Sequence, residues 1–319
     1  MPMLRRGRKR PARNLEADVL PRTAPADARP LNALTVDVED YYHVSAFEAI
    51  APRERWDAFE SRIVGSTGRL LDLLERASVK ATFFILGWVA ERHPGLVRSI
   101  QAAGHEVACH SYWHRLVYRQ TPEEFRADLC RARDVLQDIT GERVTAYRAP
   151  SFSITRQSLW ALDILIEEGF EIDSSVYPTY HDRYGLPGAP SRPYTIRRPA
   201  GVIHEFPMAV WRKFGYPLPV GGGGYFRLYP YLLTRLGLRS LNARGTPFAA
   251  YVHPWEVDPD QPRLSPGRLR AFRHYVGLRR TARKLARLLS DFRFGTLSEA
   301  FAAVGVRGEV ETWDAAAAA

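Results

Sequence analysis

The sequence predicts a parallel α/β fold, built as an open sheet or as a barrel. Short apolar runs typical of strands alternate with longer stretches in which apolar residues recur at helical spacing. The strand-type runs are Leu34–Val38, Ala81–Leu86, Glu106–Cys109, Val144–Tyr147 and Phe248–His253. The carboxyl ends of parallel strands lie on one side of the sheet, so the polar residues that follow these runs are candidates for chemistry.

The stretches between these runs carry helix signals. One apolar face is marked by Leu70, Leu71 and Leu74. The stretch 121–140 opens with Thr-Pro-Glu-Glu, which predicts an N-cap, a proline in the first turn and acidic residues near the positive end of the helix dipole. It ends before Gly141, a typical helix stop, so we predict a helix over this stretch.

The net charge of +10 is concentrated in two end segments. Residues 1–30 hold eight Arg and Lys against three acidic residues, and residues 263–293 hold ten against one. The remainder of the 319-residue chain is therefore mildly acidic. Nucleic-acid-binding proteins usually carry their basic surface on the domain that reads the nucleic acid, so this distribution argues against a nucleic-acid partner.

The composition divides the chain into three parts. We predict a disordered basic arm over 1–30, a single catalytic domain over 31–303 and a C-terminal tail over 304–319. No apolar run approaches the ~20 residues of a membrane span, and no apolar stretch follows the basic N-terminus as in a secretory signal. The cytoplasm is therefore the expected compartment. Two cysteines are too few for a disulfide framework or a thiolate zinc site.

Acidic and imidazole side chains follow two of the predicted strands. Asp37, Glu39 and Asp40 end the first, and carboxylates this close repel one another unless a cation or a proton-transfer role compensates. His110 and His114 follow the third, at a spacing that lets two imidazoles share a divalent ion on a helix or tight turn. Two histidines and one carboxylate leave coordination positions open, as in a catalytic metal site. A solvated acidic turn and a chance histidine pair are the alternatives.

Polar residues also follow three later strands. Arg148 is placed either to fix the ionisation and orientation of nearby carboxylates or to form a structural salt bridge. Asp173 either orients a neighbouring polar group or caps a turn. His253 ends a buried strand beside Trp255, an aromatic residue suited to the wall of a pocket.

These segments occur in the order of a known family. The set TVDVED, ATFFILG, HSYWH, RAPSF, IDSSVYP and YVHPW resembles the polysaccharide deacetylases of carbohydrate esterase family 4, the NodB-homology domain. The stretches GGGGYFRLYPY and HPWEVDPDQPR are similar to the subfamily associated with exosortase/PEP-CTERM exopolysaccharide loci of Gram-negative bacteria. The resemblance covers residues 32–301 and implies a distorted (β/α) barrel with about seven parallel strands. It also implies metal-dependent removal of N-acetyl groups from N-acetylhexosamine residues of a glycan.

The resemblance implies roles for individual residues. Asp37 matches the catalytic base and Arg148 the arginine that holds it, while His253 matches the general acid. Asp173 is expected to hold the His253 imidazole in position. A backbone N–H near residues 151–152 is expected to share the oxyanion with the metal.

The implied cofactor is a divalent metal ion, zinc first, with cobalt or nickel as alternatives. His110 and His114 match the family's two imidazole ligands. The family has a second aspartate directly after the base, where this chain has Val38, so the metal carboxylate is Glu39 or Asp40. Glu39 would share a face with the base on a strictly extended strand, but a bend at the strand end favours the shorter Asp40, which we predict as the ligand.

Substrate contacts are expected from residues close to these motifs. They are Pro150, Phe152, Tyr177, Tyr225 and Trp255. Val176 or Tyr177 takes the position of the family's tryptophan, at the acetyl-methyl pocket. The glycine run 221–224 lacks the continuation of a phosphate-binding loop, so we expect a flexible rim that turns Tyr225 and Arg227 toward the sugar.

The stretch 265–289 predicts one basic helix, because its apolar residues fall at near-helical spacing with basic residues between them. Such a helix either packs on the barrel with its cationic face outward or docks onto anionic lipid or an acidic polymer. Peripheral contact with a membrane is therefore an open alternative. The sequence makes no prediction of oligomeric state.

Three classes of function compete. The prediction is a polysaccharide N-deacetylase acting on an N-acetylated glycan, in exopolysaccharide biosynthesis or modification. The alternative within the same fold is an amidohydrolase that acts on a small non-sugar amide or ureide. A binding protein that has lost the reaction is the third, and the intact set of candidate catalytic residues argues against it.

Overall fold

A computed structural model describes residues 29–305 and 311–314, apart from positions 182, 214 and 266. Its centre is a run of neighbouring parallel strands. In spatial order they are β10 (Ala249–Val252), β1 (Asn32–Val38), β2 (Thr82–Ile85), β3 (Glu106–Cys109), β4 (Ala146–Tyr147), β5 (Ile172–Asp173) and β7 (Gly201–Glu205). A parallel bridge between Met208 and Ala249 joins the segment after β7 to β10, so the sheet closes on itself. The predicted barrel with about seven parallel strands is confirmed.

The remaining strands extend this sheet or form a separate hairpin. β6 (Tyr194–Arg198) pairs antiparallel with β7, β12 (Glu311–Asp314) pairs parallel with β6, and β11 (Phe294–Gly295) pairs with β1. β8 (Val210–Lys213) and β9 (Tyr216–Pro219) form a two-stranded antiparallel sheet. β12 lies within the stretch predicted as a tail, whereas residues 1–28 of the predicted basic arm lie outside the described residues.

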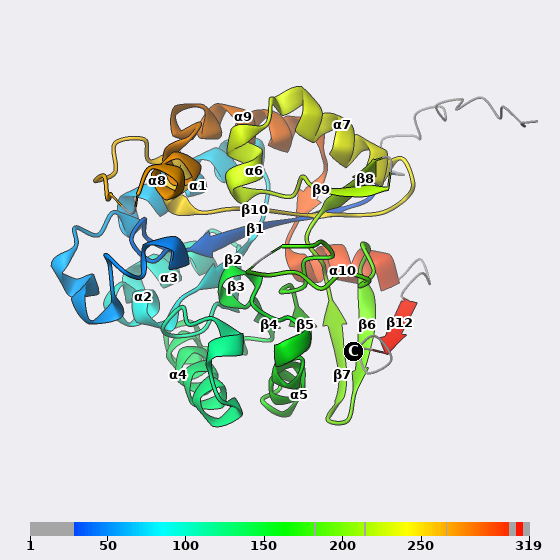
Figure 1. Ribbon diagram of the computed structural model, residues 1–319, viewed down its shortest axis with the longest axis horizontal. Coiled ribbons are helices and arrows are strands. Elements are labelled where there is room, and N and C mark those ends of the chain that lie inside the picture. Colours follow the sequence, from blue (N-terminus) through cyan, green and yellow to red (C-terminus); the bar gives the residue numbers. More distant parts are fainter. Residues whose placement is uncertain (1–28, 182, 214, 266, 306–310, 315–319) are drawn as a thin grey trace, which may run out of the picture.

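Helices cover both sides of the strands. Figure 1 shows α6, α7, α8 and α9 on one side of β1 and β10, and α2, α4 and α5 on the other. Their bounds, with the other helices, are α1 (Ile63–Ala77), α2 (Gly87–Arg92), α3 (Pro94–Ala102), α4 (Pro122–Thr140), α5 (Trp160–Glu167), α6 (Gly223–Leu228), α7 (Tyr231–Asn242), α8 (Arg268–Tyr275), α9 (Leu278–Asp291) and α10 (Leu297–Gly305). No helix among the described residues combines the length and the hydropathy that crossing a membrane requires.

The helix predicted over 121–140 has the termini that its sequence indicates. The Thr121 hydroxyl accepts a hydrogen bond from the Glu124 N–H, and the Glu124 carboxylate accepts one from the Thr121 N–H, which forms a capping box. Pro122 occupies the first turn, and Gly141 ends the helix in the left-handed conformation with φ of 70°. Local sequence therefore sets both ends of α4.

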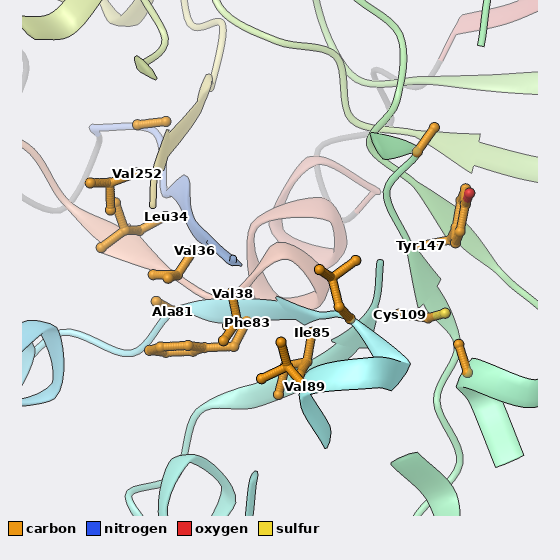
Figure 2. Close-up of a cluster of buried hydrophobic side chains, with 14 of the residues drawn as sticks. Leu34, Val36, Val38, Ala81, Phe83, Ile85, Val89, Cys109, Tyr147 and Val252 are labelled. Carbon is orange, nitrogen blue, oxygen red and sulfur yellow. The ribbon is translucent and has the colours of Figure 1, made fainter. Parts of the chain in front are cut away.

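Residues alternate between two faces along the barrel strands. Leu34, Val36 and Val38 of β1 point outward and pack with residues of β2 and β10 under the helices (Figure 2). The intervening residues point inward, where small and aromatic side chains fill the lower part of the barrel. These include Ala33, Phe84, Ala108, Ala146 and Ala249. The polar residues at the upper strand ends continue the inward series, so the strand period positions the site.

The single basic helix predicted over 265–289 is wrong. The structure has two helices here, α8 and α9, which are separated at residues 276–277. Gly277 has φ of 76°, and a Cβ at that position would lie 2.6 Å from the Arg227 carbonyl oxygen. Only glycine fits this close approach in a left-handed conformation, so the helix breaks at this point.

Candidate active site

Arg148 lies at the centre of the inward polar series and is fully buried. Its Nη1 donates to Asp37 Oδ1 at 2.6 Å and to Thr35 Oγ1 at 2.7 Å. On the other side, its Nε and Nη2 donate to the Ser174 carbonyl and hydroxyl at 3.0 and 2.8 Å. The guanidinium thus fixes one oxygen of Asp37 and leaves Oδ2 directed toward the cavity.

Glu39 lies between the two imidazoles that the sequence singled out. Its Oε1 is 3.0 Å from His110 Nε2 and 2.9 Å from His114 Nε2. Burial alone raises the pKa of this carboxyl, but the charge of His114 and the imidazole contacts outweigh it and hold the pKa well below its usual range. One carboxylate and two imidazoles therefore converge from β1 and β3.

This donor set fits a divalent cation. The ligand atoms of Glu39, His110 and His114 all lie within 4.8 Å of one another. His110 Nδ1 donates to the Arg148 carbonyl at 2.7 Å, so Nε2 is the ring nitrogen that faces the Glu39 oxygen and is placed to coordinate a cation. Two imidazoles and a carboxylate are also ligands that zinc accepts.

The prediction that Asp40 joins the imidazole pair is wrong. Its Oδ2 accepts hydrogen bonds from the Ser61 hydroxyl at 2.7 Å and the Arg62 N–H at 2.9 Å, so the side chain anchors the start of α1. Although β1 ends at Val38, the alternation of its side chains continues for one more residue. Glu39 therefore shares the inward face with Asp37, and the expected bend does not occur.

The loop that carries the histidines is a strained turn. Ser111 and His114 have φ of 64° and 52°, a conformation that is costly outside glycine. Both oxygens of Asp128, on α4, accept from backbone N–H groups of this loop, Tyr112 at 2.7 Å and Trp113 at 3.1 Å. Asp128 thus holds the turn that lets two imidazoles meet. This role of Asp128 is not predictable from the sequence, because a carboxylate on an amphipathic helix gives no local signal.

His253 faces the same cavity from β10. Its Nε2 is 3.9 Å from both Asp37 Oδ2 and Glu39 Oε1, while its Nδ1 lies 3.2 Å from Glu256 Oε2. Burial alone lowers the pKa of the imidazole, but the hydrogen bond and charge of Glu256, with the charges of Glu39 and Asp37, raise it to about 9. An imidazole that carries its proton thus lies close to two carboxylates.

Glu256, rather than Asp173, supports the His253 imidazole, so the prediction for Asp173 is wrong. Glu256 is fully buried and accepts from Arg227 Nε at 2.6 Å. Burial alone raises its pKa, but the charge of Arg227 and the contacts with His253 lower it to about 2. Arg227 is itself buried and donates to this carboxylate, so it is not turned toward a sugar as expected. The signal that would have found Glu256 is its place three residues after His253, in a capping-box spacing.

Asp173 faces away from the cavity because its neighbours on β5 face inward. Its Oδ1 accepts from the Ser175 hydroxyl at 2.5 Å, and its side chain hydrogen-bonds with that of Glu205. Burial raises the pKa of Asp173 to about 6, and burial together with the charge of Asp173 raises that of Glu205 well above its usual range. This fully buried pair therefore shares a proton held on Glu205.

We expect Glu205→Gln to flatten the dependence of stability on pH. A carboxyl whose pKa is raised by folding stabilises the fold fully below its unfolded pKa near ~4, and this stability is lost as pH rises through the folded pKa. One such proton corresponds to a slope of about 1.4 kcal/mol per pH unit. Urea unfolding between pH 4.5 and 8 measures the slope. The exposed Glu142→Gln is the control, and equal slopes in both variants would contradict the shared proton.

The residues that are expected to contact substrate differ in how deeply they are buried. Phe152 contacts the Tyr177 ring edge-on at 5.4 Å, and both are buried. Trp255 stacks on His253 at 5.1 Å and on His274 at 4.1 Å, so both of its faces are covered. Tyr225 is half-buried on α6. These contacts with substrate, and that of the buried Pro150, stay predictions.

A shallow cavity of about 180 Å³ opens beside His114. Aromatic side chains of Tyr42, Trp56 and Trp113 line it together with Arg53 and Arg115. Aromatic faces with a few polar groups are typical of sites that bind sugars or other small ligands. Of the two imidazoles, His114 is the one that lines this cavity.

The family comparison agrees with this geometry. A family model described as "Polysaccharide deacetylase" matches residues 56–165, the segment that carries His110, His114 and Arg148. Over this segment the chain is similar to polysaccharide deacetylases. A second model, described as a "Domain of unknown function (DUF3473)", matches residues 174–302 and includes His253. Asp37 and Glu39 precede both matched segments.

Curated relatives match part of this chain. A peptidoglycan-N-acetylglucosamine deacetylase from Bacillus cereus is 33% identical over 98 residues, which are 30% of this chain and 36% of that protein. The peptidoglycan-N-acetylglucosamine deacetylase PgdA of Listeria monocytogenes is 35% identical over 91 residues, 28% of this chain and 20% of that protein. The matched part is thus well under half the length of either relative.

Solved structures of low identity share the fold. A "putative polysaccharide deacetylase" from Mycobacterium smegmatis superposes with a TM-score of 0.60 at 22% identity, covering 90% of this chain and 93% of that one. The Puue allantoinase superposes with a TM-score of 0.57 at 16% identity, covering 89% and 92%. The barrel of this chain is therefore shared with proteins of more than one named activity.

Proposed function

We propose that this chain is a metal-dependent N-deacetylase that hydrolyses the N-acetyl groups of N-acetylhexosamine residues in a polysaccharide. The observation that carries the proposal is the arrangement around Asp37. Asp37 Oδ1 accepts a hydrogen bond from Arg148, and Asp37 Oδ2 lies 3.9 Å from His253 Nε2. Glu39, which lies between the two imidazoles, is close to both Asp37 and His253. A base, a proton donor and a cation site thus surround one small space.

Hydrolysis of an amide needs a proton acceptor for water and a proton donor for nitrogen. Asp37 Oδ2 accepts the proton of the attacking water, because Oδ1 is held by Arg148. As the C–N bond breaks, His253 Nε2 donates its proton to the departing nitrogen, so acetate and a free amine form. Glu256 holds the other side of the imidazole and keeps Nε2 aimed at the cavity. These are positions that acid–base catalysis requires.

Glu39, His110 and His114 would hold a divalent cation, zinc first, with cobalt or nickel as alternatives. When bound there, the cation supplies Lewis acidity to the carbonyl group and to water. The backbone N–H of Ser151 is the candidate to stabilise the oxyanion, since the N–H of Phe152 already donates to the Ala149 carbonyl. Ser151 has φ of 51°, so its peptide is held in an uncommon orientation beside the site.

The substrate that we propose is an exopolysaccharide. The names of the curated relatives support an N-acetylated glycan, since the matched proteins act on peptidoglycan N-acetylglucosamine. The sequence stretches shared with the exosortase-associated subfamily support an exopolysaccharide rather than peptidoglycan, and they lie in the second matched segment, 174–302. The aromatic lining beside His114 supports a sugar chain as the ligand.

The purified chain should release acetate from N-acetylglucosamine oligomers when zinc or cobalt is added. A chelator should abolish the release, and added metal should restore it. Ring opening of a cyclic ureide, measured in parallel, tests the alternative amidohydrolase activity. Metal-restored ring opening without any acetate release would reject the glycan substrate but keep the cation site, whereas neither reaction at full metal occupancy would reject both.

A further inference from the structure

A large cavity lies apart from the catalytic groups. It has a volume of about 710 Å³, within the ~300–1,000 Å³ usual for ligand sites. Its walls are the junction of α6 with α7, the segment before α8, and the first three turns of α9. The break at Gly277 opens it, because α8 and α9 diverge there.

This cavity is strongly cationic. Its lining includes six basic side chains that are exposed or half-buried, and no Asp or Glu. They are Arg263, Arg279, Arg280, Arg283, Lys284 and Arg287. Lys284 has a structural task, since its Nζ donates to the carbonyls of Phe226, Arg227 and Tyr229 at 2.7 to 3.0 Å. The other five lack a salt bridge with any described carboxylate.

Arginines this close together on a helix repel one another, so they do not stabilise α9 itself. Positions 279, 280, 283 and 287 fall on one side of the helix, while Leu278, Leu285 and Leu288 are buried in the hydrophobic core. The exposed cations therefore complement a ligand that is negatively charged at several points.

Exposed apolar side chains flank the same cavity. Among the described residues, five of the nine exposed large hydrophobic side chains lie on α6, α7 and α8. Leu228 lines the cavity and is 51% exposed, and Leu232 and Leu236 follow on one face of α7. Leu269 and Phe272, 62% and 56% exposed, lie on α8, whose last residue, Tyr275, lines the cavity. Water-facing leucines beside arginines have no use in binding a soluble polyanion.

We propose that the surface formed by this cavity and its flanking leucines, here called the α7–α9 surface, docks onto a membrane that contains anionic lipids. Lipid phosphates pair with the arginines, and the leucines enter the boundary between headgroups and acyl chains. Figure 1 shows α7, α8 and α9 on the same side of the barrel. An acidic polysaccharide would use the arginines but not the aliphatic side chains, so the membrane is the favoured occupant.

The test is co-sedimentation of the full chain with lipid vesicles. Neutral phosphatidylcholine vesicles are compared with vesicles that also contain phosphatidylglycerol, each at low and high salt. We expect binding to the anionic vesicles at low salt, with loss at high salt. Because one arginine near an anionic surface contributes about a five-fold gain in partitioning, Arg283→Gln/Arg287→Gln should bind roughly 30-fold more weakly.

Two further variants distinguish binding through arginine charge from binding through insertion of leucine side chains. Arg76→Gln/Arg98→Gln removes two exposed arginines from α1 and α3 and should bind like wild type. Leu232→Ser/Leu236→Ser should weaken binding to anionic vesicles without changing the thermal midpoint, because both side chains face solvent. Equal binding of the Arg283/Arg287 variant and its control would overturn the proposal. The proposal would also be overturned if the chain bound soluble polygalacturonate through Arg283 and Arg287 but did not bind vesicles.

Discussion

Glu39→Gln will lose bound metal, while its neighbour Asp40→Asn will keep it. Glu39 supplies the carboxylate between two imidazoles, whereas Asp40 bonds to Ser61 and Arg62. Loss of groups that merely orient ligands costs 10- to 100-fold in metal affinity, so loss of a direct ligand should cost at least ~100-fold. Titration of the apo-protein with zinc or cobalt, followed by calorimetry, measures both affinities.

The pair is matched because both variants neutralise a buried carboxylate in adjacent positions. Asp40→Asn should instead lower the thermal midpoint, since Asp40 accepts bonds that anchor the start of α1. The opposite pattern, with metal lost in Asp40→Asn and retained in Glu39→Gln, would show that the strand bends at 39–40 as the sequence analysis expected.

Asp37→Asn will abolish most acetate release while leaving metal affinity unchanged. The amide keeps an oxygen for Arg148 but loses the carboxylate that accepts the proton of water. General base catalysis contributes about 10²- to 10⁴-fold, so kcat should fall by that factor. Steady-state assays at saturating metal measure the loss.

The matched control is Asp173→Asn, another buried aspartate at a strand end. Its side chain lies on the outer face of β5 with Glu205, so kcat should stay within a few-fold of wild type. A wild-type rate for Asp37→Asn would remove the base from the proposed mechanism. A large loss for Asp173→Asn without loss of stability would restore the role first expected for that residue.

Much of the barrel follows from local sequence. The five apolar runs coincide with β1, β2, β3, β4 and β10 to within two residues, since a fully buried parallel strand is apolar on both faces. The capping box fixes α4. The pairing of β6, β7 and β12 was not predicted, because β6 and β7 are short and partly exposed and β12 pairs with a strand far away in sequence.

The site residues are predicted correctly where the inward–outward alternation of strand side chains is applied, and wrongly where it is not. Applying the two-residue period strictly past Val38 would have selected Glu39, and applying it on β5 would have turned Asp173 outward. Arg148 and His253 were placed near Asp37 by the family resemblance, and the distances agree. The support given by Asp128 and Arg227 depends on contacts between distant helices and loops, which one sequence does not encode locally.

Because β1 pairs with β10, residues that meet in the candidate site are synthesised at different times on the ribosome. Glu39, His110 and His114 all leave the ribosome in the first part of translation, so the ion-holding trio is complete early. His253 emerges much later and reaches the trio only when β10 docks beside β1. The three residues of the proposed cation site are therefore synthesised long before the proposed proton donor, and the proposed site is complete only when the closing strand has paired.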